Sequence, residues 1–210
     1  MTTFYFVRHG KTELNLQTSF QGSGIDSPLL PEGIDQAVEL GQYLSDEAFD
    51  LVAVSTQKRA MDTANYIVME NNHLNQLTVV YHDGLREIGF GDREGMQVDE
   101  TDVQTDYLRH RPDMYDPSEF GGESFDELVQ RSSETIKTLH QQFPNGKVLI
   151  VAHGVLLLVL TNYLIGKNKK DWRTGGPLEN TSLTIVDYTP EQSNLKVFND
   201  ISYRSSVDEQ

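Results

Sequence analysis

The chain has 210 residues, of which 37% are hydrophobic and 23% charged, a balance that suits an ordinary globular protein. Its formal net charge of −15 disfavours nucleic acid and anionic membranes as partners, because both would be repelled. It contains no cysteine, which excludes disulfides, thiolate metal sites and a cysteine nucleophile, and which fits a reducing compartment.

The sequence has no apolar run of the ~18 residues that a membrane-spanning helix requires, so we expect no membrane span. Its first residues lack the basic region and apolar stretch of a secretory signal. Together with the absence of cysteine, these features lead us to expect a cytoplasmic protein. We expect a monomer or a homodimer.

The first predicted element is a buried strand over residues 4–7, which leads directly into Arg8, His9 and Gly10. Side chains alternate along a strand, so Arg8 and His9 can face one site only if the strand ends at about Arg8. Gly10 allows the tight turn that this requires. The segment therefore predicts a guanidinium and an imidazole side by side at a strand end.

The next segments alternate between helix and strand. They predict a turn-rich loop over residues 17–31, a helix that follows it directly and reaches Leu44, a short buried strand over 51–54 and a helix over 56–69. Ser55 is a good N-cap for the last of these helices. Arg59 lies in its first turn, close to a strand end, and is a candidate for binding an anion.

The middle of the chain predicts a strand over residues 77–81, a glycine-rich loop over 85–95 and an irregular acidic insert over 98–122. The loop carries three carboxylates, Glu87, Asp92 and Glu94, and composition alone does not choose among them. The insert, with a helix expected at about 103–109, is of a kind that forms either a lid or a passive surface loop. A capping box at Ser124 opens the helix that follows.

The opening pattern returns near the end of the chain. A buried strand over residues 148–152 ends at His153 and Gly154, before an apolar helix over 155–165. Ligands of open α/β sheets lie beyond the carboxyl ends of the parallel strands. The two His-Gly pairs therefore indicate two imidazoles that face one crevice.

Strands that alternate with helices up to about residue 165 predict an α/β fold with a mostly parallel sheet. Residues 180–188 and 195–198 predict an antiparallel hairpin at the edge of the sheet. No linker or low-complexity tract divides the chain. We therefore expect a single domain over residues 1–210, with a lid-like insert at about 98–122.

Two arginines and two histidines near a loop carboxylate match the needs of phosphoryl transfer. Arginine presents paired donors to phosphate oxygens, a neutral imidazole can attack phosphorus, and the helix N-terminus after Gly154 favours an anion. A carboxyl group supplies a proton to the leaving oxygen and later accepts one from water. This set needs neither a metal nor another cofactor. A zinc site built from His9, His153 and His82 is the rival, and the arginines disfavour it because they would repel the cation.

Five motifs in chain order resemble those of the histidine phosphatase superfamily, in its phosphoglycerate mutase-like branch. They are Arg8-His9-Gly10-Lys11-Thr12 with Asn15, Ser55 with Arg59-Ala60 and Thr63-Ala64, Leu85-Arg86-Glu87 with Phe90-Gly91 and Glu94-Gly95, Gly122-Glu123-Ser124, and Val151-Ala152-His153-Gly154. The resemblance covers residues 4–154. It implies a three-layer α/β/α sandwich with a mostly parallel sheet.

The resemblance also implies a role for each matching residue. His9 would be the phosphorylated nucleophile and Glu87 the proton donor to the leaving group. Arg8, Arg59 and His153 would hold the transferred phosphoryl group. The other positions that would seat the phosphate are Asn15, Gln21, Gly22 and Gly154. The implied activity is that of a metal-independent phosphomonoesterase that acts on small phosphorylated metabolites through a phosphohistidine, without a cofactor.

Two alternatives remain open. A 2,3-bisphosphoglycerate-dependent phosphoglycerate mutase would use the same site, but Leu14 before Asn15 and the run Phe20-Gln21-Gly22 depart from the mutase pattern and favour a phosphatase. Arg93 stands where many relatives have an aromatic residue, which bears on substrate preference. A non-catalytic module that binds phosphate esters is disfavoured, because no catalytic position is missing.

Overall fold

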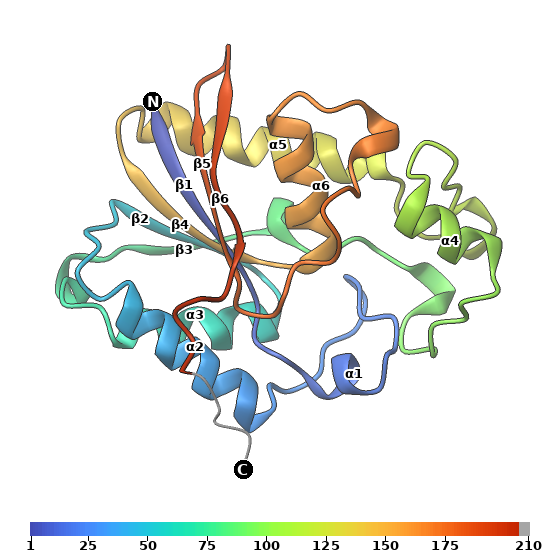
Figure 1. The fold of residues 1–210 in the computed structure, drawn as a ribbon, viewed down its shortest axis with the longest axis horizontal. Helices are drawn as coiled ribbons and strands as arrows, with labels where there is room; N and C mark the ends of the chain where they lie inside the picture. Colours follow the sequence, from blue (N-terminus) through green and yellow to red (C-terminus); the bar gives the residue numbers. More distant parts are fainter. Residues whose placement is uncertain (206–210) are drawn as a thin grey trace.

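The computed structural model describes residues 1–205 and is built around a six-stranded sheet (Figure 1). The strands are β1 (Thr2–Arg8), β2 (Leu51–Ser55), β3 (Val79–His82), β4 (Lys147–Ala152), β5 (Leu183–Tyr188) and β6 (Ser193–Asp200). Their order across the sheet is β3-β2-β4-β1-β5-β6. The first four strands in this order are parallel, whereas β5 runs antiparallel to both β1 and β6. The predicted mostly parallel sheet with an antiparallel edge is confirmed.

Helices cover both faces of the sheet and complete a three-layer α/β/α sandwich (Figure 1). They are α2 (Pro31–Tyr43) and α3 (Lys58–Met69) on one face, and α5 (Phe125–Gln142) and α6 (Gly154–Leu164) on the other. Because side chains alternate along β1, Phe4 and Phe6 pack with α5 and α6, whereas Tyr5 and Val7 pack with α2 and α3. The central strands β1, β2 and β4 are therefore buried on both faces, whereas the edge strands β3 and β6 are partly exposed.

Shorter elements complete the chain. They are α1 (Glu13–Leu16), α4 (Val103–His110) and the 3-10 turns η1 (Leu74–Gln76), η2 (Asp83–Leu85), η3 (Gly91–Arg93), η4 (Ser118–Phe120) and η5 (Lys169–Asp171). The α4 helix lies within the insert 98–122, at the right of Figure 1, and Asp102 caps its N-terminus. Arg93 binds both oxygens of Asp102, at 2.6 and 3.1 Å, and lies 4.0 Å above the ring of Phe120. Arg93 thus connects the glycine-rich loop to two points of the insert.

Several predicted boundaries differ from the structure, and the hairpin strands are among them: β5 begins at Leu183 rather than at residue 180, and β6 is longer than the predicted 195–198. α2 begins at Pro31, which the prediction places at the end of the preceding loop, because the fixed φ and missing N–H of proline suit the first helical position. β3 begins at Val79 rather than at residue 77, because η1 precedes it. α3 begins at Lys58, and the prediction that Ser55 caps it is wrong: Ser55 ends β2, and its hydroxyl is turned towards His153.

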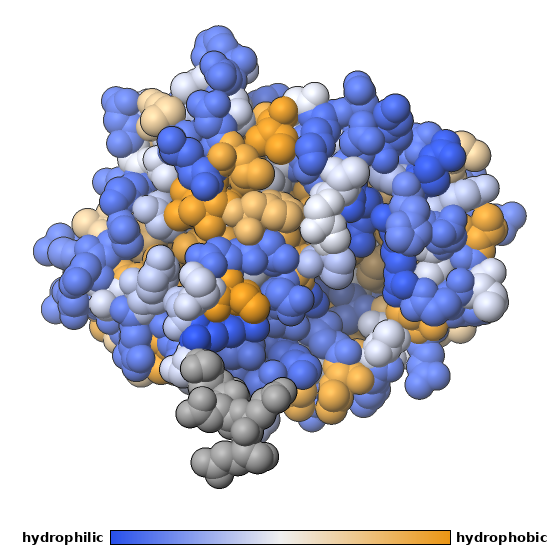
Figure 2. All heavy atoms as spheres, in the orientation of Figure 1, coloured by the Kyte–Doolittle hydropathy of each residue, from blue (hydrophilic) through white to orange (hydrophobic). Residues whose placement is uncertain are grey.

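The molecular face drawn in Figure 2 is mostly hydrophilic, in keeping with the net charge of −15. Among the described residues, no helix combines the length and the apolar character needed to cross a bilayer. The arginines of the candidate active site, described below, therefore lie in a molecule that is acidic overall.

Candidate active site

Two histidines meet where neighbouring strands end. β1 and β4 are adjacent and parallel, and Arg8 lies opposite Ala152, so the residues that follow them leave the sheet at one place. These residues are His9 and His153, whose ring centroids lie 5.3 Å apart with the rings tilted at 58°. The structure thus brings the two His-Gly pairs together because their strands are neighbours.

His9 is held in a form that suits a nucleophile. It is only 3% exposed, and its Nδ1 lies 2.8 Å from the carbonyl oxygen of Gly10. Because a carbonyl oxygen can only accept, Nδ1 carries the proton and Nε2 keeps its lone pair. Burial, and then the positive charges of Arg59 and Arg8, hold the pKa of His9 well below its usual range. The imidazole is therefore neutral, with Nε2 available to attack.

The turn after β1 is fixed by contacts from two helices. The N–H of Gly10 donates to the hydroxyl of Thr63 on α3 at 2.9 Å, and this hydroxyl donates to the carbonyl of Arg59 at 2.7 Å. From α2, Gly33 approaches so closely that a Cβ on it would lie 2.5 Å from the carbonyl oxygen of Lys11. A Cβ on Gly10 would lie 2.6 Å from the carbonyl oxygen of Gly33. Both positions need glycine, because two backbones meet there.

Arg8 extends from the end of β1 towards the N-terminus of α6. Its Nη1 donates to the carbonyl of Leu178, and its buried Nε has no partner within residues 1–205. A Cβ at Gly154 would lie 3.0 Å from this Nε, so glycine makes room for the guanidinium. Arg8 and the first N–H of α6 therefore lie side by side as donors to an anion.

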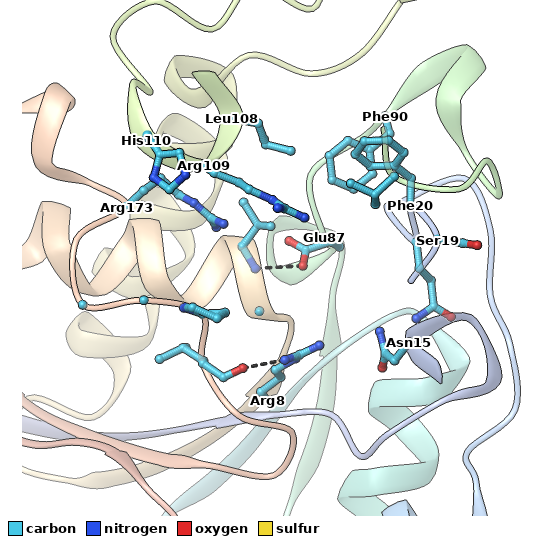
Figure 3. Close-up of a pocket in the computed structure, with 18 of the residues that line it drawn as sticks. Arg8, Asn15, Ser19, Phe20, Glu87, Phe90, Leu108, Arg109, His110 and Arg173 are labelled. Atoms are coloured by element: carbon cyan, nitrogen blue, oxygen red, sulfur yellow. Dashed lines mark hydrogen bonds between the residues drawn. The ribbon is translucent and has the colours of Figure 1, made fainter. Parts of the chain in front are cut away.

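Asn15 is oriented through its amide oxygen. This oxygen accepts from the N–H of Thr12 at 3.2 Å and from the side-chain amide of Asn180 at 3.3 Å. Asn180 also donates to the carbonyl of His9 at 3.0 Å, which links the hairpin side of the sheet to the nucleophile. Figure 3 shows Asn15 and Arg8 on the same side of the cavity. Asn180 was missed at the sequence level because it lies 171 residues from His9.

Arg59 is 1% exposed and anchors the loop between α1 and α2. Its Nη atoms donate to the carbonyls of Gly22 and Ile25, both at 3.0 Å, and to the carboxylate of Asp26 at 2.9 Å. Its Nε has no partner in the described chain. Arg59 thus lies close enough to His9 for its positive charge to lower the pKa of the imidazole. Most of its N–H groups, however, are hydrogen-bonded to the loop.

Gln21 and Gly22 belong to the same loop, and several of their polar groups are already paired. The side-chain amide of Gln21 donates to Thr12 at 2.9 Å, and its oxygen accepts from Ser27 at 2.6 Å. The N–H of Gly22 donates to Glu94 at 2.8 Å. Gln21 lines the cavity described below, whereas Gly22 does not. Their part in seating a phosphate stays a prediction.

His153 is completely buried and is oriented by Ser55. Its Nε2 lies 2.7 Å from the Ser55 hydroxyl, and its Nδ1 has no partner within the described residues. Burial, and then the charge of Arg59, hold the pKa of His153 well below its usual range. Ser55 was misread from the sequence because a serine between a strand and a helix also fits an N-cap.

Glu87 is the only one of the three loop carboxylates that lines the cavity. Its two oxygens accept from the backbone N–H groups of Val155, at 2.9 Å, and Leu156, at 2.8 Å, in the first turn of α6. A helix N-terminus favours a carboxylate in this place. Asp92 is exposed, and Glu94 instead binds backbone amides of the surrounding loops.

The backbone of Glu87 is also fixed on both sides. Its N–H donates to the side-chain oxygen of Gln57 at 2.8 Å, and its carbonyl accepts from Arg131 at 3.1 Å. Arg131 in turn pairs with both oxygens of Glu123, at 2.6 and 2.8 Å. No local sequence signal marks Gln57 or Arg131, since they lie 30 and 44 residues from Glu87.

The site opens into a cavity of about 860 Å³ (Figure 3). Six of the predicted site residues line it: Arg8, His9, Asn15, Gln21, Glu87 and Gly154. Arg59 and His153 do not line it and are buried beside His9. The lining also includes an apolar group, Phe20, Phe90, Val98 and Leu108, and a cationic group, Arg109, Lys170 and Arg173.

Within residues 1–205, no three His, Asp or Glu side chains converge so as to hold a metal ion.

Comparison with known proteins places this arrangement in a family. Residues 4–201 match the profile of the histidine phosphatase superfamily (branch 1). The chain belongs to the histidine phosphatase superfamily. It is 35% identical over 205 residues to PhoE, an uncharacterised phosphatase of Bacillus subtilis (strain 168), and the match covers 98% of each chain. It is 30% identical to the broad-specificity phosphatase YOR283W of Saccharomyces cerevisiae (strain ATCC 204508 / S288c), over 92% of this chain and 82% of the yeast protein.

Solved structures of histidine phosphatases show the same fold. YhfR of Bacillus stearothermophilus superposes with a TM-score of 0.86 at 31% identity, over 97% of this chain and 99% of that one. The family assigned from five sequence motifs is therefore confirmed, as is the three-layer fold that it implied.

Proposed function

We propose that this protein is a metal-independent phosphomonoesterase that hydrolyses small phosphorylated metabolites through a phosphohistidine at His9. The observation that carries the proposal is a neutral imidazole with a free Nε2 in the wall of a cavity that also holds Arg8 and Glu87. The phosphatase names of the relatives support it.

In the first half of the reaction, Nε2 of His9 attacks the phosphorus of the monoester. The N–P bond forms as the P–O bond to the leaving group breaks. Glu87, as a carboxylic acid, gives its proton to the leaving oxygen, which departs as an alcohol. Arg8 and the N–H of Gly154 neutralise charge on the phosphoryl oxygens. The bond from Nδ1 to Gly10 keeps the ring oriented as it gains positive charge.

In the second half, water attacks the phosphorus from the side that the alcohol has left. The N–P bond breaks, inorganic phosphate departs, and His9 returns to its neutral form. Glu87, now a carboxylate, takes the proton from the water and is ready for the next cycle. One carboxyl group thus serves both halves of the reaction.

Arg59 and His153 are proposed to hold the phosphoryl group from the buried side. If the Ser55 hydroxyl donates to Nε2 of His153, then Nδ1 carries the proton and can donate to a phosphate oxygen. The Nε atom of Arg59 is buried and unpartnered within residues 1–205, so it is also available. Asn15, Gln21 and Gly22 are proposed to complete the phosphate site.

The proposal extends to the molecule as a whole. We infer a single domain over residues 1–210 in which the insert 98–122 acts as a lid, because α4 of the insert contributes residues to the cavity wall. We further infer a cytoplasmic monomer or homodimer. Nucleic acid and membranes are not expected as partners, because the net charge of −15 repels them.

The test is hydrolysis of p-nitrophenyl phosphate in the presence of EDTA, with the unaltered protein beside His9→Ala. Turnover that survives chelation and disappears in His9→Ala is expected. Turnover that EDTA abolishes would refute a metal-independent reaction. Appreciable turnover in a folded His9→Ala variant would refute His9 as the nucleophile.

Phosphoglycerate mutase activity is separated from hydrolysis by a second assay. A mutase must exclude water from the phosphoenzyme so that the phosphoryl group returns to a bound product. Release of inorganic phosphate from several phosphomonoesters, without isomerisation of 3-phosphoglycerate, is the result that a phosphatase predicts. Isomerisation without phosphate release would assign the protein to the mutases.

A further inference from the structure

The outer part of the cavity gathers positive charge that the proposed phosphoryl site does not use. Its lining includes Arg109, Lys170 and Arg173, and Glu87 is the only carboxylate among the described residues that line the cavity. The whole chain, by contrast, carries a net charge of −15. Positive charges that line a cleft create a local positive potential, which attracts an anionic ligand into the cleft even when the protein as a whole is acidic.

In the part of the chain that the structure describes, Arg173 is held by none of its own polar groups. Within residues 1–205 its guanidinium forms no hydrogen bond or ion pair, and its Nε is buried without a partner. Burial is the main cause that lowers the pKa of Arg173, to about 10, so the group stays charged near neutral pH. The side chain as a whole is half-buried, and leaving the buried Nε donor unpaired away from water costs free energy. A bound anion would relieve that cost.

The backbone on both sides of Arg173 is held in place by one buried side chain. The amide of Asn162 donates to the carbonyl of Trp172 at 2.9 Å and to that of Thr174 at 3.0 Å. Asn162 belongs to α6, the helix whose N-terminal Gly154 lies at the phosphoryl site. One helix therefore fixes both Gly154 and the segment that carries Arg173. Such support from a rigid element is what a precise binding site requires.

Arg109 approaches the same space from the insert. It lies near the end of α4 and forms an ion pair with Glu100. Figure 3 shows Arg109 and Arg173 reaching into the cavity on the side away from Phe20 and Phe90. Arg109 and Arg173 thus lie on one side of the cavity and the two phenylalanines on the other, with Glu87 between them.

We propose that Arg173, with Arg109 and Lys170 beside it, forms a second anion-binding subsite, and that the preferred substrates are phosphomonoesters with a second anionic group. That group is a carboxylate or a second phosphate, and it stays on the carbon skeleton after hydrolysis. The proposal rests on the phosphatase function above and adds the substrate class. Arg8 binds the phosphoryl group that is transferred, and Arg173 binds the anion that is retained.

The test compares kcat/KM within matched pairs of substrates. In the first pair, 6-phosphogluconate carries a carboxylate at C1, where glucose 6-phosphate has its aldehyde carbon. In the second pair, fructose 1,6-bisphosphate carries one phosphate more than fructose 6-phosphate. The unaltered protein is expected to prefer the second member of at least one pair by about tenfold or more, the effect of one charge-assisted hydrogen bond. The pair that shows the preference identifies the anion as carboxylate or phosphate.

Variants of Arg173 assign the preference to this side chain. Arg173→Gln should abolish the preference, chiefly by raising KM for the doubly anionic substrate, and Arg173→Lys should restore part of it. Arg111→Gln is the matched control, because Arg111 pairs with Asp113 and does not line the cavity. This control also removes one positive charge, here from the insert, and should keep the full preference.

Equal kcat/KM within both pairs for the unaltered protein would overturn the subsite, and so would a preference that survives Arg173→Gln. Hydrolysis of p-nitrophenyl phosphate would in either case leave the phosphatase function standing. A protein that hydrolyses no phosphomonoester at all would overturn both proposals. The comparison with unaltered protein involves no variant, so an absent preference overturns the subsite even where Arg173→Gln fails to fold, and a preference is then assigned with Arg173→Lys.

Discussion

The carboxylate of Glu87 accepts a hydrogen bond from the backbone N–H of Val155, two residues after His153, at 2.9 Å. This bond joins the loop that carries the proposed proton donor to the strand end that carries the second histidine. It gives one oxygen of Glu87 a fixed position, while the carboxyl group still lines the cavity that His9 faces. The acid is thus oriented by the first turn of α6, and the nucleophile by the end of the neighbouring strand β1.

Glu87→Gln is expected to separate the two halves of the reaction. The weakly basic p-nitrophenolate can leave without a proton, so the phosphoenzyme should still form, whereas its hydrolysis needs the missing base. Rapid mixing should therefore show a burst of one nitrophenolate per protein, followed by turnover about 10²–10⁴-fold slower than in the unaltered protein. With glycerol 3-phosphate, whose leaving group needs protonation, the variant should give no burst of released glycerol.

Asp92→Asn is the matched control for this variant, because Asp92 is an exposed carboxylate of the same loop. It should keep normal turnover with both substrates. Glu87→Gln with normal steady-state rates would remove Glu87 from the proposed mechanism.

Ser55→Ala is expected to lower both turnover and stability. Removing the hydroxyl leaves a buried nitrogen of His153 unpaired, which costs about 1–3 kcal/mol, and lets the ring lose its orientation. Turnover should fall by up to about tenfold, the effect of one neutral hydrogen bond of ~1 kcal/mol. Denaturant unfolding and steady-state kinetics measure the two effects. Ser182→Ala is the control, since its buried hydroxyl has no partner in the described chain, and equal effects in both variants would contradict the role of Ser55.

Gly33→Ala tests whether an added methyl group at this position raises or lowers the free energy of unfolding. In an ordinary helix this change stabilises by roughly 1 kcal/mol, because alanine is the better helix former. Here the added Cβ would lie 2.5 Å from the carbonyl oxygen of Lys11, so we expect destabilisation of about 1–3 kcal/mol, as for overpacking. Turnover should fall as well, because the turn that carries His9 must shift. A stabilised and fully active variant would contradict the close contact between α2 and this turn.

The two buried histidines make stability depend on pH. Burial comes first, and Arg59 second, among the causes that hold the pKa values of His9 and His153 below the ~6.5 of an unfolded chain. The unfolded state therefore binds protons first as the pH falls, so the stabilising contribution is complete above pH ~6.5 and is lost below it. Each histidine lowers the free energy of unfolding by up to about 1.4 kcal/mol for each pH unit below ~6.5. Unfolding free energies between neutral and mildly acidic pH should show a shallower slope for the double variant His9→Asn, His153→Asn, and an unchanged slope would contradict this account.

Much of the site could be predicted from short patterns. The buried strands that end in Arg8-His9-Gly10 and His153-Gly154 are local signals, and the rule that ligands lie at the carboxyl ends of parallel strands brings them to one crevice. The alternation of strands and helices likewise predicted the mostly parallel sheet, whereas the three layers were implied by the family resemblance. The choice of Glu87 came from the family resemblance, and its place in the cavity wall agrees with that choice.

The residues that position the site could not be predicted, because their partners are distant in sequence. Ser55 fits an N-cap locally, and only the pairing of β2 with β4 places it next to His153. Asn180 is only the first residue of a predicted strand until the fold brings it to the carbonyl of His9. Gly33 is unremarkable until α2 packs on the turn at Gly10. Local patterns give the elements and the reactive groups, whereas contacts between elements fix the geometry.

The most direct test of the central claim is to trap the phosphoenzyme. The Glu87→Gln variant is mixed with p-nitrophenyl phosphate, quenched in base to preserve the acid-labile N–P bond, and examined by mass spectrometry of the intact protein and of its peptides. The account predicts one added phosphoryl group per chain, located on His9 and formed at the rate of the nitrophenolate burst. A burst without this adduct, or an adduct on any other residue, would contradict it.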